Sequence, residues 1–229
     1  KQNLHFDNIK VTDDTSQIGI VDTIIFSVKL WDTIEAIRTC IPIIGPQTLV
    51  LPLQNGVESI KMLSERVGEK HVLGGVIFIA AEITQPGTIT QHGNIAKIIF
   101  GKPNQKSSIP LKELSAALDS QSIDIKLTKN IETAIWEKYI ALVAISGATC
   151  LTRLPLRTLM ANEQTRTLIE NIMVEVISLA KLKNVDVADD IIFRHKEFLN
   201  SVSPKMTSSM LADLKNGNRL ELPWLSGGV

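Results

Sequence analysis

The chain has 229 residues, of which 44% are hydrophobic, and its 24 lysines and arginines are balanced by 24 aspartates and glutamates. This neutral composition excludes the strong charge bias that is typical of proteins that bind nucleic acid or a membrane surface. The length suffices for one large or two modest domains with a sizeable core.

Two short apolar runs near the start of the chain predict a pair of parallel strands. The runs are Thr23–Lys29 and Gln47–Gly56. Both consist mostly of β-branched or aliphatic residues with little alternation, as is typical of strands that are buried on both faces of a parallel sheet. A helix is expected between them from Asp32, with isoleucines at helical spacing and Pro42 to end it.

This order of strand, helix and strand is a βαβ unit, and sheets built from such units bind ligands outside the carboxyl ends of their strands. Lys29 and Asn55 stand at those two ends. Both are therefore candidates for ligand contacts. Asn55 before Gly56 equally suits a simple turn, and Lys29 equally suits a solvated surface position.

The rest of the chain predicts further helices and strands and then helices alone. The first group comprises a helix Val57–Val67 closed near Gly68, a strand Val72–Ala81, a hairpin Glu82–Gln91 turning at Pro86-Gly87, a strand Lys97–Phe100, a helix starting at Ser108-Ile109-Pro110, and a strand Ser122–Leu127. The second group comprises helices Ile131–Leu151, Asn162–Asn184, Asp189–Val202 and Pro204–Asn216, the last with Ser203 as N-cap and Gly217 as stop. We therefore expect an α/β domain over residues 1–129 and an all-α domain over residues 130–229.

Lys138 is the most distinctive polar residue of the helical part. It lies in Trp136–Leu142, and the next two helical turns are almost wholly apolar. A lysine that leads into a buried helix must snorkel to water, pair with a charge, or lower its pKa through loss of hydration. Two interpretations stay open: a snorkelling surface lysine beside Glu137, or a general acid that works near neutral pH.

Glu221 is the natural companion of Lys138. It lies in the segment Asn218–Trp224, which its proline biases toward extended geometry, and the two flanking leucines are expected to pack inward. A solvated carboxylate is an equally open alternative. Thr207-Ser208-Ser209, expected on the preceding helix, supplies hydroxyls that either bind a carboxylate or bond back to their own backbone.

The remaining residues indicate no metal site, membrane span or oxidising compartment. Cys40 and Cys150 are isolated, and the four histidines share no spacing with one another or with an acidic cluster. The longest apolar stretch, around Tyr139–Leu151, is shorter than the roughly 18 residues that span a bilayer, and no signal-peptide pattern opens the chain. We expect a cytoplasmic protein without a metal, and exposed apolar helix faces would suit a homodimer.

Six short stretches together resemble the ketopantoate reductase (2-dehydropantoate 2-reductase) family. They are Val28-Lys29-Leu30-Trp31, Leu53-Gln54-Asn55-Gly56-Val57, Pro86-Gly87-Thr88-Ile89, Trp136-Glu137-Lys138, Thr207-Ser208-Ser209-Met210 and Arg219-Leu220-Glu221. They occur in the order of the family across nearly the whole chain. The resemblance implies a Rossmann-type domain that binds NADPH, followed by a helical domain that closes the substrate cleft.

The resemblance also implies roles for individual residues. Lys138 looks like the general acid that protonates the carbonyl oxygen of a 2-oxo acid while NADPH delivers hydride, and Glu221 looks like the acidic residue that helps place substrate and cofactor. The implied cofactor contacts are Lys29, Asn55 and Ala81. The candidate substrate contacts are Ser209, Ser208 and Ser146.

A glycine-rich G-x-G-x-x-G turn, which normally follows the first strand of a dinucleotide-binding domain, is not found in these 229 residues. Either the chain holds no such domain, or its first roughly 60 residues, about two βαβ crossovers, are missing. With the resemblance, we expect an incomplete Rossmann-type domain that lacks its first βαβ unit, in a chain cut at both ends. Such a chain should bind NADPH poorly by itself.

Three positions depart from the family pattern. Leu142 and Ser146 stand one and two turns after Lys138 where the resemblance leads us to expect Asn, and Met206 replaces an Asn shortly before the serine pair. Leu offers no hydrogen bond and Met at best a weak acceptor. Because sites that pair a substrate hydroxyl discriminate strongly through such bonds, these changes bear on the substrate.

The expected function is NADPH-dependent reduction of a 2-oxo acid, first of all 2-dehydropantoate to pantoate in pantothenate and coenzyme A biosynthesis. Two alternatives stay open. One is a paralogue that reduces a more apolar 2-oxo acid, which Leu142 and Met206 would suit. The other is a nucleotide-binding protein without catalytic activity, against which the joint presence of Lys138 and Glu221 argues.

Overall fold

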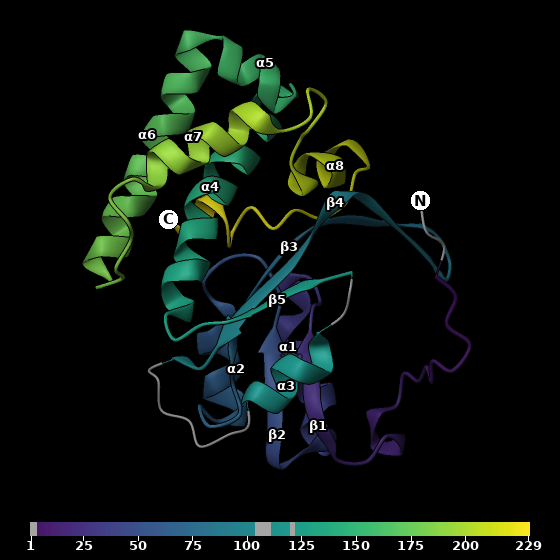
Figure 1. Ribbon diagram of the computed structural model, residues 1–229. Helices are drawn as coiled ribbons and strands as arrows, with labels where there is room; N and C mark the ends of the chain where they lie inside the picture. Colours follow the sequence, from purple (N-terminus) through teal and green to yellow (C-terminus); the bar gives the residue numbers. More distant parts are fainter. Residues whose placement is uncertain (1–3, 104–110, 120–121) are drawn as a thin grey trace.

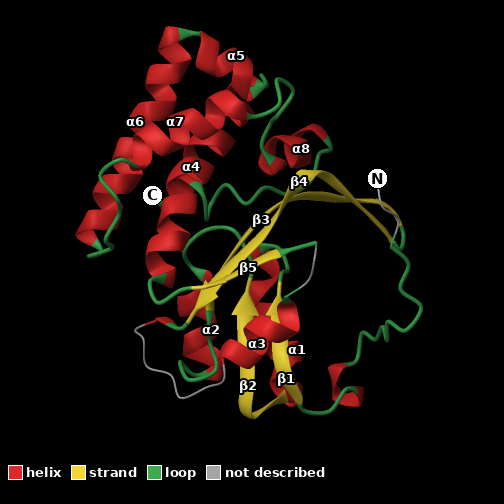
Figure 2. Ribbon diagram, viewed as in Figure 1, coloured by secondary structure: helices red, strands yellow, loops and turns green. Residues whose placement is uncertain are grey.

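The computed structural model describes residues 4–103, 111–119 and 122–229. Within these ranges an α/β region comes first and a group of helices follows, as Figures 1 and 2 show. The predicted fold class is thereby confirmed. The division into domains at residues 129 and 130 stays a prediction.

The first part of the structure is a parallel βαβ unit. Its strands, β1 (Val21–Phe26) and β2 (Ile44–Pro52), pair in parallel and end side by side. Helix α1 (Thr33–Cys40) joins them between two short 3-10 turns, Leu30–Asp32 and Ile41–Ile43. The strand, helix and strand expected from the sequence are all present.

The burial of the two strands differs from the expectation. β2 is buried over most of its length, whereas Ile25 of β1 is 50% exposed. Burial on both faces is therefore wrong for β1. In the described part of the chain β1 pairs with β2 alone, so this strand keeps an alternating pattern of buried and exposed side chains.

Three more strands form a mixed sheet. β3 (Gly74–Gln85) and β4 (Thr88–Gly101) make an antiparallel hairpin, and β5 (Asp124–Leu127) lies parallel to β4. The hairpin turns at Gly87 as predicted, with a φ of +77° that glycine adopts without strain. β4 is one long strand, not the short segment expected near its end, because its pairing with β3 resumes beyond an irregularity after Ile79.

Helices and one backbone bridge tie the two sheets together. The helices are α2 (Ser59–Val67), which ends at Gly68 as predicted, and α3 (Leu111–Leu118). The predicted start of the second of these, at Ser108-Ile109-Pro110, lies outside the described residues. The sheets meet at Val50, whose N–H donates to the carbonyl of His71 (2.8 Å) and whose carbonyl accepts the N–H of Leu73 (2.9 Å).

The helical region is built around one long helix. It comprises α4 (Ile131–Thr152), α5 (Leu156–Ala161), α6 (Glu163–Leu182), α7 (Ile191–Ser201) and α8 (Ser209–Lys215), and the chain closes with a 3-10 turn at Ser226–Gly228. Side chains from α4 to α8 share one apolar core. The short helix α5 was not expected from the sequence.

Among the described residues, α4 is long and apolar enough to cross a membrane by length and composition, but 61% of its apolar window is buried inside the protein. The stretch Tyr139–Leu151 alone understates this helix, because α4 already begins at Ile131. Burial on nearly all sides is what a core helix of a helical domain shows.

The last helix begins later than expected. The hydroxyl of Ser208, not that of Ser203, accepts the backbone N–H three residues on at 3.0 Å, so Ser208 is the N-cap of α8. The expected start at Pro204 is wrong because the chain turns there. Met206 donates its N–H back to Ser203 (2.9 Å), and its carbonyl accepts the N–H of Leu156 (2.9 Å).

Candidate active site

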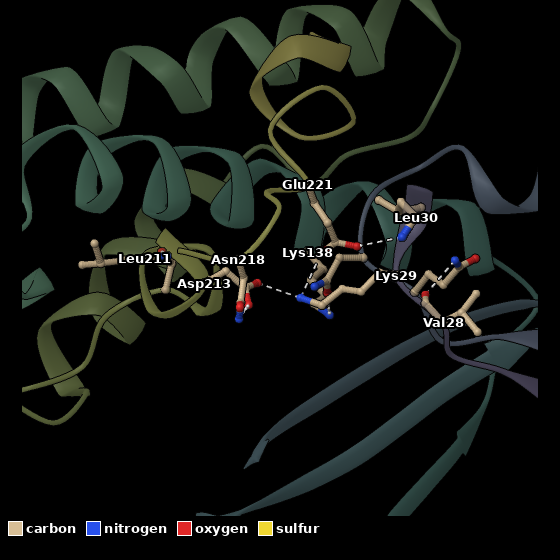
Figure 3. Close-up of polar contacts among 11 residues, drawn as sticks. Val28, Lys29, Leu30, Lys138, Leu211, Asp213, Asn218 and Glu221 are labelled. Carbon is tan, nitrogen blue, oxygen red and sulfur yellow. Dashed lines mark hydrogen bonds and ion pairs between the residues drawn. The ribbon is translucent and has the colours of Figure 1, made fainter. Parts of the chain in front are cut away.

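Lys138 points from α4 toward the ends of strands in the α/β region, and Figure 3 shows its surroundings. Its ammonium donates to the Asn55 Oδ1 at 2.8 Å and to the carbonyl of Ile77 at 2.8 Å. The ring of Phe78 lies 5.6 Å from the same nitrogen. The amine is therefore fixed by β3 and by the loop after β2, and it does not snorkel freely into solvent.

Loss of hydration dominates the electrostatics of Lys138. Burial lowers its pKa from 10.5 to about 8, and the negative charge of Glu221 opposes this shift. The two acceptors on the ammonium are neutral, so they do not compensate the charge as a bonded carboxylate would. An ammonium carries three N–H donors, and two of them are engaged within the described residues. One remains for a ligand.

Glu221 is buried, with 7% of its surface exposed, and it joins the two regions of the chain. Its Oε1 accepts the backbone N–H of Leu30 at 3.0 Å, and its Oε2 lies 4.0 Å from the ammonium of Lys29. The solvated alternative for this carboxylate is thus excluded. Figure 3 shows the carboxylate reaching from the C-terminal segment to the loop after β1.

The segment around Glu221 differs from the extended arrangement expected. The backbone carbonyl of Glu221 accepts the N–H groups of Trp224 and Leu225, both at 3.0 Å, so the chain turns there. As a result Leu222, expected to pack inward, is 45% exposed while Glu221 is buried.

Lys29 lies three residues beyond β1 and is held by a residue that the sequence did not single out. Its ammonium is 2.7 Å from the Oδ2 of Asp213 on α8. The other carboxylate oxygen, Oδ1, accepts from the side-chain amide of Asn218 at 3.1 Å. The one signal for Asp213 in the sequence is its position one helical turn after Ser209.

Lys29 and Asn55, the two candidates at strand ends, lie beyond the same edge of the structure. Leu53 donates its N–H to the carbonyl of Phe26 at 2.9 Å, which places the ends of β1 and β2 together. Gln54 reinforces this edge by donating to the carbonyl of Val28 at 2.9 Å. Gln54 and Asn55 also line a small cavity whose other wall includes Lys138 and Leu142 of α4.

The serine candidates and Ala81 are placed differently. The Ser146 hydroxyl donates to the carbonyl of Leu142 at 2.6 Å, so its proton is taken by its own helix. Ser208 caps α8 and shares a 2.7 Å hydrogen bond with Thr149. Ser209 is exposed at the start of α8, and Ala81 is exposed on β3, about 13 Å along the strand from Ile77.

Within residues 4–103, 111–119 and 122–229, no group of three or more His, Cys, Asp and Glu side chains could hold a metal ion. The charged side chains gathered at the site are Lys138, Glu221, Lys29 and Asp213. Two cations and two carboxylates meet where the α/β region faces the helices.

Comparison with protein families matches two models to the chain. Residues 1–105 match "Ketopantoate reductase PanE/ApbA", and residues 130–229 match "Ketopantoate reductase PanE/ApbA C terminal". Together they cover the α/β region up to the end of β4 and all of the helices α4 to α8.

Individual relatives and solved structures agree with this match. A 2-dehydropantoate 2-reductase of Halobacterium salinarum is 27% identical over 222 residues, covering 96% of this chain and 71% of the relative. The crystal structure of 2-dehydropantoate 2-reductase from Geobacter metallireducens superposes with a TM-score of 0.86 at 25% identity, over 92% of this chain and 70% of that one. D-mandelate dehydrogenase in a ternary structure with NADH and anilino(oxo)acetate shares the fold, with a TM-score of 0.83 at 18% identity over 96% of this chain and 70% of that one.

Proposed function

Because this chain belongs to the ketopantoate reductase PanE/ApbA family of oxidoreductases, we propose that it reduces a 2-oxo acid to the 2-hydroxy acid with a reduced nicotinamide cofactor. The observation that carries this proposal is the partly dehydrated ammonium of Lys138, with a pKa of about 8 and one donor that no described residue engages. A general acid works best when its pKa lies near the operating pH.

The residues at the ends of β1 and β2 fit a nicotinamide. The Oε1 of Gln54 is buried and has no hydrogen-bond partner among the residues that the structure describes. The amide cannot be turned around to relieve it, because the carbonyl of Val28 needs the donor nitrogen that now faces it. A carboxamide N–H is the kind of donor that such an acceptor binds. We propose that Gln54, Asn55 and Lys29 hold the cofactor there.

In this mechanism a bound reduced nicotinamide supplies hydride to the carbonyl carbon of the substrate. Lys138 uses its free N–H to bind the carbonyl oxygen and gives that oxygen its proton as negative charge develops. Glu221 favours the protonated form of Lys138 through its charge, without a hydrogen bond to it among the described residues. Asn55 and Ile77 keep the amine aimed by occupying its other two donors.

The substrate we propose first is 2-dehydropantoate, with NADPH as the cofactor. A second candidate, a more apolar 2-oxo acid, is favoured by one specific observation. Leu142 lies one turn beyond Lys138 and lines the same small cavity. The hydroxyl of Ser146 donates its hydrogen bond to the backbone carbonyl of Leu142. Leu142 and Ser146, one and two turns beyond Lys138, therefore offer no side-chain donor to a substrate hydroxyl.

Oxidation of NADPH and NADH by the intact protein tests the proposal, with 2-dehydropantoate, a branched aliphatic 2-oxo acid and an aromatic 2-oxo acid as substrates. Turnover of 2-dehydropantoate with NADPH supports the first candidate, and turnover of the apolar acids alone supports the second. Cofactor binding without turnover of any of them would leave only the nucleotide-binding alternative. Faster turnover with NADH would overturn the cofactor assignment.

We further propose that the protein works in the cytoplasm and as a homodimer. The exposed apolar side chains of the helical region, such as Phe193 at 65% and Leu182 at 80%, support self-association. Light scattering of the intact protein at micromolar concentration distinguishes a dimer from a monomer.

A further inference from the structure

The ion pair between Lys29 and Asp213 takes no part in the proton transfer proposed above, yet it connects the two regions of the chain. Lys29 follows β1, and Asp213 lies on α8, 184 residues later in the sequence. Figure 3 shows the lysine extended from the loop after β1 to the carboxylate of Asp213. At 2.7 Å this is a charge-assisted hydrogen bond, which is stronger than a neutral one.

Asp213 is the fixed partner of this pair. Its side chain is 17% exposed, and its second oxygen accepts from the amide of Asn218 at 3.1 Å. The backbone carbonyl of Asp213 also accepts the N–H of Asn218 at 2.9 Å. The Lys29 side chain is 42% exposed. Its ammonium lies 5.6 Å from the centre of the Trp31 ring, and the carboxylate of Asp213 is its hydrogen-bond partner.

A second carboxylate competes for the same ammonium. The Oε2 of Glu221 lies 4.0 Å from the Lys29 nitrogen, too far for a hydrogen bond but close enough for attraction. Without the charge of Asp213, Lys29 is free to turn to Glu221, which is bound at Leu30, and away from α8. Glu221 cannot move to meet it without losing the N–H of Leu30.

We propose that Asp213 is a positioning residue for the cofactor, which holds the ammonium of Lys29 extended between the loop after β1 and α8, apart from Glu221. This inference rests on the proposed function, because it takes Lys29 to be a cofactor contact. The net charge of the site alone predicts the opposite effect of losing Asp213 on the affinity for the cofactor. A dinucleotide is anionic, so the loss of a negative charge near its site should strengthen binding.

Direct binding of NADPH to the intact protein, followed by fluorescence titration, tests the proposal. Asp213→Asn should raise the Kd for NADPH about tenfold, as expected for the loss of one charge-assisted contact. Asp213→Glu should keep the Kd for NADPH within about threefold of the parent value, because glutamate supplies the same carboxylate on a longer side chain. At saturating NADPH the kcat of Asp213→Asn should stay within about threefold of the parent while KM rises.

Matched controls separate positioning from a structural effect. Asp190→Asn also removes a helical-region carboxylate from a 3.0 Å ion pair, with Arg194, and should leave the Kd unchanged. In a Lys29→Met background, Asp213→Asn should have no further effect on the Kd. Without cofactor, the melting temperature of Asp213→Asn should lie within about 2 °C of the parent, since a part-exposed pair contributes little to stability.

An unchanged or lower Kd in Asp213→Asn would overturn the positioning role, and so would an equal loss of affinity in the Lys29→Met background. Absence of NADPH binding by the intact protein without any substitution is a different outcome. It would reject the proposed function itself.

Discussion

Raising the pH tests the assignment of Lys138 most directly. The difference between its ordinary pKa of 10.5 and the value of about 8 corresponds to about 3 kcal/mol of extra cost for charging the amine in the folded protein. With a pKa of about 8, about nine-tenths of the lysine is protonated at pH 7 and about one-tenth at pH 9. A lysine with its ordinary pKa would lose only about 3% of its protons over the same interval.

The expected result is a fall of about tenfold in kcat/KM for reduction between pH 7 and pH 9, because reduction needs the protonated form. The reverse oxidation needs the neutral amine and should rise over the same interval. Initial rates of NADPH oxidation with the 2-oxo acid, and of NADPH formation from NADP with the 2-hydroxy acid, measure the two directions in a buffer of constant ionic strength. The Lys138→Arg variant is the control, since a guanidinium does not titrate in this range and its profile should be flat.

A flat profile for the parent protein would refute the reasoning, as would a midpoint near 10.5. A fall of the same size in Lys138→Arg would assign the titration to another group.

Three further changes probe the same site. Lys138→Ala should lower turnover about a hundredfold or more, the lower range for loss of a general acid, whereas Lys97→Ala, which removes an amine paired with Asp124 on the surface, should leave turnover unchanged. A loss of about tenfold or less in Lys138→Ala would reject its role. Glu221→Gln should move the midpoint of the pH profile below 8, because a charge that raises the pKa of Lys138 is lost while the amide can still accept the N–H of Leu30. A midpoint that stays or rises would contradict this. Leu142→Asn should favour a hydroxyl-bearing 2-oxo acid over an apolar one by about tenfold in kcat/KM relative to the parent, as the new amide offers a hydrogen bond. Equal changes for both acids would argue against a substrate contact at this position.

The parts of the site that follow from local pattern were predictable from the sequence. Parallel strands end at one edge, so the order of strand, helix and strand was enough to place Lys29 and Asn55 beyond the same edge of the sheet. Lys138 stood out because it leads into an apolar helix. α4 itself was recognised to within one residue at its end.

The parts that depend on long-range contacts were not predictable. Asp213 meets Lys29 across 184 residues, and no local pattern marks such a pair. The burial of Glu221 follows from a turn closed by backbone bonds from Trp224 and Leu225, which side-chain patterns do not reveal. The start of α8 was placed too early because both Ser203 and Ser208 suit an N-cap, and only the turn between them decides.

The two acceptors on Lys138 differ in how evolution can alter them. The oxygen of Asn55 belongs to a side chain, so a single codon change removes it. The oxygen of Ile77 belongs to a peptide group, which every amino acid supplies. One of the two hydrogen bonds that hold this amine is therefore insensitive to substitutions at Ile77, as long as the backbone of β3 keeps its conformation. A comparison of sequences alone would not reveal this hydrogen bond.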